Sequence, residues 1–195
     1  MSAVSEAGET PRYKAAAMTL HWLIAAGIVF QVLWGWYFTG LDRGPAKQAA
    51  EHLHISLGLT ILLLTVARIA IRLLSRPPPL PAGMKGWEVL LSKAAHILFY
   101  VLMLALPLTG WAMESTGGRS PPFWGLNWPS FPIISAMSRE ESRPLHGLLE
   151  TVHGSVLGWT MVVLFGLHVL GALKHQFDGS PVLYRMLPFL PKPRS

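Results

Sequence analysis

Long uncharged runs constrain this chain more than any other feature of its sequence. Residues 15–41 and residues 151–173 carry no formal charge. About 20 consecutive apolar residues are enough for an α-helix to cross the hydrocarbon core of a bilayer. Only 13% of all residues are charged, whereas a soluble domain has about 25%. The sequence therefore predicts an integral membrane protein.

Four such runs predict an all-α, four-helix membrane bundle that forms a single domain over residues 1–195. The predicted helices cover about 15–40, 53–74, 94–113 and 151–174. Pro107 falls inside the third helix and should kink it, because proline removes one backbone hydrogen bond. Residues 114–150 form the longest connection. Its Trp124 and Trp128 favour a lid at the membrane interface, where aromatic side chains concentrate.

The charges and the missing cysteines exclude several classes of function. The net charge is +6, but no basic patch is interleaved with aromatic residues in a polar domain, so we expect no nucleic-acid partner. The chain has no cysteine. Disulfides, iron–sulfur ligands and covalent haem attachment are therefore excluded.

Lysine and arginine predict the orientation in the membrane. Two of them lie before residue 15, five between residues 68 and 93, and four after residue 173, whereas the two in 42–51 and the three in 114–150 are balanced by acidic residues. Cytoplasmic segments of membrane proteins carry an excess of these residues. Both termini and the 76–93 connection are thus expected in the cytoplasm, and the 42–51 and 114–150 connections outside.

Four histidines fall at two depths in this topology. His21 and His168 lie near the cytoplasmic side, whereas His54 and His153 lie near the exterior. The 15-residue step from His153 to His168 is ~22 Å along a helix. Two histidines from different helices at one depth can hold a haem iron from both faces. The pattern predicts two haems with these four axial ligands. The alternatives are interfacial hydrogen-bonding histidines or a haem-free, histidine-lined transporter.

The remaining histidines and two arginines allow two interpretations each. His96 and His175 could bind the headgroup of a quinone or anchor their helices at the interface. Arg68 and Arg72 could contact haem propionates or extend to lipid headgroups. His52 and His146 are expected at the outer surface, without a role in the site.

These residues lie in stretches that resemble the bacterial cytochrome b561 family. The matching stretches are TLHW (19–22), HISLGLTILLLTVARIAIRL (54–73), AHILFYVLMLALPLTGW (95–111) and HVLGALKHQF (168–177). The resemblance implies a multi-pass protein of the bacterial inner membrane in which each histidine pair holds one haem b. It also implies that Thr19 and His175 lie near ubiquinone. In family members the second ligand of the fourth helix usually lies 14 positions after the first, one fewer than the 15 positions here, and a π-bulge would absorb the additional residue.

The resemblance implies electron transfer between the periplasmic face and the quinone pool. One family type oxidises superoxide and reduces ubiquinone, which would make this chain a superoxide:ubiquinone oxidoreductase. The second hypothesis is a quinol-linked electron carrier, or a membrane anchor for a periplasmic redox partner. No residue is identified as catalytic from the sequence.

Overall fold

The computed structural model describes residues 12–75, 78–79, 84–178 and 182–187. Among them are four helices long and apolar enough to cross a membrane. The first three are α1 (Ala15–Thr39), α2 (Pro45–Leu74) and α3 (Gly86–Glu114). The fourth is continuous from Arg139 to Phe177. It consists of α5 (Arg139–Glu150), the π-helix η2 (Thr151–Gly158) and α6 (Trp159–Phe177).

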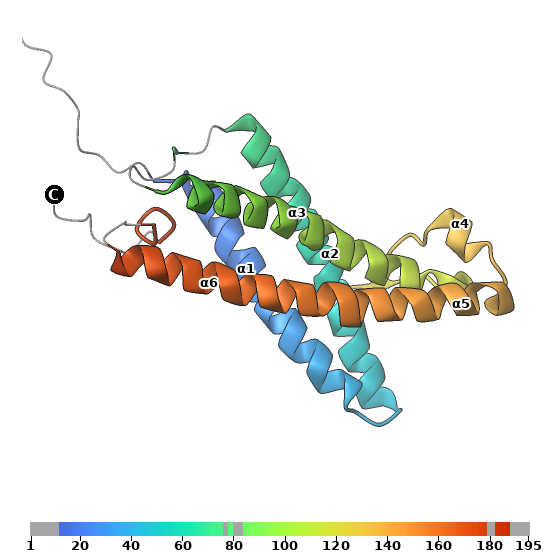
Figure 1. Ribbon diagram of the computed structural model, residues 1–195. Helices are drawn as coiled ribbons and strands as arrows, with labels where there is room; N and C mark the ends of the chain where they lie inside the picture. The colour runs from blue at the N-terminus through green and yellow to red at the C-terminus, as the bar shows by residue number, and fades with distance from the viewer. Residues whose placement is uncertain (1–11, 76–77, 80–83, 179–181, 188–195) are drawn as a thin grey trace, which may run out of the picture.

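The four helices pack in sequence order around a small central core. α1 packs on α2, α2 on α3, and α3 along the whole fourth helix. Figure 1 shows the α1–α2 pair crossing the pair formed by α3 and the fourth helix. The core consists of Ile24, Ile61, Leu102, Met103, Met161 and Leu164. Large apolar side chains also cover the outside, as at Val163, which is 58% exposed. Helices that are apolar all round are typical of membrane spans.

Three of the helices begin earlier than predicted. α2 starts at Pro45, α3 at Gly86 and the fourth helix at Arg139, where the sequence predicted 53, 94 and 151. Proline is preorganised for the first position of a helix, which explains the start of α2. Charged residues mark where a span leaves the membrane, but lysine, glutamate and glutamine are good helix formers. The helices therefore continue beyond the apolar runs.

The fourth helix contains the predicted π-bulge. Residues Thr151–Gly158 form a π-helix around His153. A π-turn contains one more residue than an α-turn, and such turns often occur at functional sites. The structure thus confirms the predicted π-bulge in the turn that carries His153.

The connection from α3 to α5 is folded and is hydrogen-bonded to α2. It contains a two-stranded hairpin, β1 (Pro122–Phe123) with β2 (Leu126–Asn127), and the short helix α4 (Pro132–Ser135). The Trp124 indole Nε1 donates a hydrogen bond to Thr60 Oγ1 (2.9 Å). The Trp124 backbone N–H donates to Ser56 Oγ (3.2 Å). Both acceptors belong to α2, so the hairpin lies against that helix.

The two ends of the described chain meet at the opposite end of the bundle from the hairpin (Figure 1). The indole Nε1 of Trp22 donates to the carbonyl of Met186 (2.8 Å), and the Tyr13 N–H donates to the carbonyl of Arg185 (3.3 Å). Residues 182–187 therefore pack on the start of α1. Both ends of the described part of the chain lie on one side of the bundle, as an even number of spans requires.

Candidate functional site

The structure brings the four histidines together as two pairs. The ring centroids of His21 (α1) and His168 (α6) are 6.3 Å apart. Those of His54 (α2) and His153 (η2) are 6.1 Å apart. We call the first pair the inner site and the second the outer site, after the predicted orientation. The predicted proximity within each pair is confirmed, and the role of these residues as ligands remains a prediction.

Both ring separations fit two imidazoles on one metal ion. An imidazole nitrogen lies about 2 Å from a bound metal and roughly 1 Å from its own ring centre. Two imidazoles on opposite sides of one iron therefore have centroids roughly 6 Å apart. Among the described residues no group of three or more His, Cys, Asp or Glu could hold a metal ion. A metal held by one such pair would need its other ligands from a bound group, as the macrocycle of a haem would supply.

A large cavity opens at the outer site. Its volume is about 840 Å³, within the range of roughly 300–1,000 Å³ for cofactor pockets. His54 and His153 contribute to its wall. Five glycines also line it: Gly35, Gly58, Gly110, Gly154 and Gly158. These glycines widen the space between the helices enough for a flat, bulky group.

Gly110 of α3 leaves room for the imidazole ring of His153. A Cβ atom at Gly110 would lie 3.1 Å from His153 Cε1 and 3.4 Å from Nδ1. Any other residue would push the imidazole toward the cavity. A Cβ at Gly154 would meet nothing within 4 Å. The imidazole of His153 is thus packed on α3 behind it, while the backbone beside it faces open space.

Thr109 and the carbonyl of Leu106 together determine which nitrogen of His153 carries the proton. The Thr109 hydroxyl donates its hydrogen to the carbonyl oxygens of Ala105 and Leu106, at 2.8 Å each. Thr109 Oγ1 also lies 3.1 Å from His153 Nδ1. Since the hydroxyl hydrogen is already used, Oγ1 accepts the bond and Nδ1 is the donor. The lone pair of His153 is then on Nε2, as a metal ligand requires.

Two buried polar atoms at the outer site have no partner among the described residues. They are Nδ1 of His54 and Oε1 of Gln31. The Gln31 amide nitrogen donates to the carbonyl of His54 (2.8 Å), which fixes this side chain beside the cavity. Buried polar groups almost always have a partner, and both atoms belong to residues that line the cavity.

At the inner site, Arg68 is the polar neighbour of His21, as Thr109 is of His153 at the outer site. Arg68 Nη2 lies 3.3 Å from His21 Nδ1, and Nη1 donates to the carbonyl of Ala17 (3.0 Å). A guanidinium has no acceptor, so His21 accepts through Nδ1 and its proton is on Nε2. Iron at Nε2 would move this proton to Nδ1 and displace Arg68 Nη2. The ring spacing of the inner site fits a haem, and its loading requires this local rearrangement.

Comparison with known proteins agrees with this architecture. The sequence model for prokaryotic cytochrome b561 matches residues 12–189. The chain belongs to the prokaryotic cytochrome b561 family. It is 30% identical to "Cytochrome b561 homolog 2" of Escherichia coli over 189 residues, 90% of this chain and 91% of that protein. It is 29% identical to "Probable superoxide oxidase CybB" of Yersinia pestis over 182 residues, 91% and 96% of the two chains.

Membership in the family establishes the general function of the chain. The family implies b-type haem and electron transfer within a membrane. Together with the four spans, it identifies a multi-pass protein of the bacterial inner membrane. The residues of both histidine pairs fit such a haem, by ring separation at both sites and by cavity and tautomer at the outer site.

His96 lies beside the inner site rather than at the start of a helix. α3 begins at Gly86, so His96 is in its third turn, and its ring centroid is 5.7 Å from that of His168. Its Nδ1 donates to the carbonyl of Ser92 (2.6 Å). Phe99, one turn further along, packs edge-on against His168 at 5.1 Å. The inner ligand therefore rests on α3, as the outer ligand does.

Thr19 and His175, the two residues predicted to lie near ubiquinone, are not linked by a hydrogen bond or ring contact among the described residues. Thr19 is exposed on α1, and His175 is half-buried near the end of α6. Arg72, predicted to contact a propionate together with Arg68, is exposed one turn beyond Arg68 on α2.

Sequence reasoning placed His146 incorrectly and missed Thr109 and Gln31. His146 is half-buried, lines the outer cavity, and has its Nδ1 2.8 Å from Thr116 Oγ1. It had been expected as a surface residue. Thr109 and Gln31 are polar residues inside apolar spans, where such side chains usually form hydrogen bonds across helices or have a function. This signal was present in the sequence.

Proposed function

We propose that this cytochrome b561 binds two b-type haems, with His21 and His168 as axial ligands of one and His54 and His153 of the other. The two ring separations, 6.3 and 6.1 Å, carry this assignment. A haem held by two imidazoles supplies one-electron transfer, because its iron changes between ferric and ferrous states. The helices hold the two sites at different depths.

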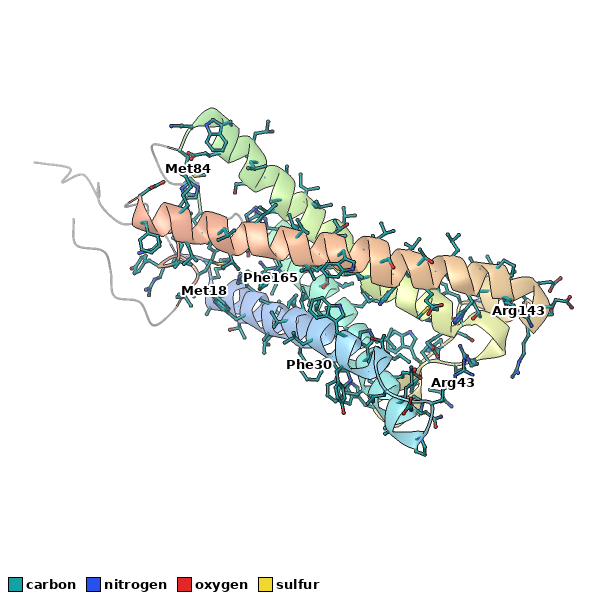
Figure 2. All side chains as sticks on the ribbon, turned by 60° about the horizontal axis from the view of Figure 1, so that its bottom comes forward. Met18, Phe30, Arg43, Met84, Arg143 and Phe165 are labelled. Atoms are coloured by element: carbon teal, nitrogen blue, oxygen red, sulfur yellow. The ribbon has the colours of Figure 1, made fainter. Side chains whose placement is uncertain are left out.

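We propose superoxide as the electron donor at the outer site. An unpaired charge is costly to transfer into hydrocarbon, so an anion should release its electron at the edge of the bilayer. The mouth of the outer cavity carries the cations Arg43, Lys47 and Arg119 and the acids Glu51, Glu114 and Glu150. Figure 2 shows Arg43 at the end of the molecule away from Met18. The name of the Yersinia pestis relative supports this donor.

We propose ubiquinone as the acceptor near Thr19 and His175, with both termini in the cytoplasm. Two superoxide ions each give up one electron and become dioxygen. One quinone takes these two electrons and two protons to become the quinol. His175 lies seven residues beyond His168 on α6, toward the side from which protons would arrive. Its imidazole would donate a hydrogen bond to a quinone carbonyl.

Quinone reduction by the purified holoprotein under a superoxide flux tests this function. Ubiquinol should form in step with superoxide loss, and His175→Ala should slow its formation while both haem spectra persist. His52→Ala, an exposed histidine change on α2, is the matched control and should be unaffected. A wild-type protein that is reduced by quinol but leaves the rate of superoxide loss unchanged would instead support an electron carrier for another partner.

A further inference from the structure

We infer that Arg68 and Thr109 act as positioning residues that set the two haem sites at different reduction potentials, with the inner site higher. This inference rests on the proposed ligand pairs. It adds a direction to the proposed electron transfer, because electrons move spontaneously toward the site of higher potential. The two residues are the immediate polar neighbours of one ligand at each site, and their chemistry is opposite.

Arg68 brings a permanent positive charge to the inner site. Its guanidinium stays protonated in proteins. Nη2 contacts His21 Nδ1 in the structure, and an imidazole bound through Nε2 can no longer accept this bond. Nη1 remains attached to the carbonyl of Ala17, one turn before His21. The guanidinium can therefore turn its second nitrogen away without leaving the site.

A cation at this position favours the reduced state of the inner site. Ferric iron carries one more positive charge than ferrous iron, and the repulsion with Arg68 is weakened when an electron arrives. Charges interact more strongly in a low-dielectric interior than in water. A propionate contacted by the freed Nη2 would have its negative charge compensated, which changes the potential in the same direction.

Thr109 has the opposite effect at the outer site. Its Oγ1 accepts the Nδ1–H of His153, because its own hydrogen is donated to Ala105 and Leu106. An acceptor on the far nitrogen makes an imidazole a stronger metal ligand. A stronger donor stabilises the more positive ferric state and lowers the potential. The three cations at the mouth of this cavity are matched by three acids, so no comparable excess of positive charge faces the site.

Potentiometric measurements on the holoprotein test the inference directly. His153→Ala and His168→Ala variants, each keeping one haem, assign the two potentials. The inner potential of the wild type should exceed the outer one. Arg68→Gln should lower the inner potential so that the electron partition between the sites changes at least tenfold, which is 59 mV for a one-electron couple. Arg68→Lys should retain most of the wild-type value.

Three further variants separate this effect from general damage. Thr109→Val, similar in shape but without the hydroxyl, should raise the outer potential, and Thr109→Ser should restore it. Arg143→Gln removes the same charge at the tip of α5, far from Met18 and the inner end (Figure 2), and should change neither potential. A wild-type inner potential at or below the outer one overturns the inference, even if Arg68→Gln loses its haem. Fewer than two haems in the wild type would instead overturn the proposed function.

Discussion

The inner and outer sites have nearly the same ring separation, but their surroundings differ. The outer pair borders a glycine-lined cavity and is supported by a neutral hydroxyl. The inner pair is surrounded by Arg68, His96 and Phe99. In the proposed haem assignment, the spacing of each histidine pair sets where a haem binds, and the residues around the pair set its reduction potential. One bundle can thus present two similar ligand sets with different electrostatics.

The largest expected effect comes from removing one ligand at a time. His153→Ala should remove the outer haem and His168→Ala the inner one, so that a pyridine haemochrome assay finds one haem per chain in each variant. The two sites share no ligand, and each remaining pair stays complete. His52→Ala should keep both haems. Loss of both haems from either variant would show that the sites are not independent.

The orientation of the two sites can be determined with a fused reporter. A reporter attached after Ser195 should behave as cytoplasmic, because lysine and arginine are concentrated at the termini and in the 76–93 connection. The same reporter inserted after Gly125, at the tip of the hairpin, should behave as periplasmic. Periplasmic activity at the C-terminus would exchange the names inner and outer and reverse the proposed direction of transfer.

Gly110→Ala should have a smaller effect, a weaker binding of haem at the outer site only. Gly110→Ala adds a Cβ 3.1 Å from His153 Cε1, and overpacking of this kind costs about 1 kcal/mol at its lower limit. The outer haem should then bind roughly fivefold more weakly, as measured by haem transfer to an acceptor protein, with the inner haem unchanged. Gly86→Ala, where an added Cβ meets nothing within 4 Å, is the control. Equal weakening of both haems would contradict this assignment of Gly110.

The smallest expected effect concerns the hairpin over the outer half of α2. Trp124→Phe removes the hydrogen bond to Thr60, and interhelical hydrogen bonds in membrane proteins contribute about 0.6 kcal/mol. Thermal unfolding should show a slightly lower stability with normal haem content. Trp87→Phe, an exposed tryptophan at the start of α3, should have no such effect. A large loss of outer haem in Trp124→Phe would mean that the hairpin supports the site directly.

The apolar runs were sufficient to predict the number of spans and the extent of α1, but not the ends of the other helices. Charge marks the membrane boundary and not the end of a helix. The capping box at the start of α5 was visible in the sequence: Ser138 Oγ accepts the N–H of Glu141, and Glu141 Oε2 accepts the N–H of Ser138. Ser-x-x-Glu before a helix is a recognised start signal. It was overlooked because the long connection was interpreted as a lid.

The pairing of histidines by depth was predictable, whereas their neighbours were not. Helical rise gives a depth from residue number alone. The contact between Arg68 and His21 depends on the crossing of α1 and α2, and the contact between His96 and His168 depends on how α3 packs on α6. These contacts come from tertiary packing, which one sequence does not specify. The π-helix was predictable only because the family spacing provided a reference.

The π-helix η2 also bears on how such a chain can tolerate insertions and deletions over generations. A residue inserted into a regular α-helix turns everything beyond it by about 100° and moves it by 1.5 Å. An insertion between Trp159 and Leu167 would thus turn one histidine of this helix away from its partner. The widened turns at Thr151–Gly158 hold an additional residue while His153 still faces His54. We therefore expect a one-residue insertion or deletion within Thr151–Gly158 to disturb the two histidine pairs less than one within α6.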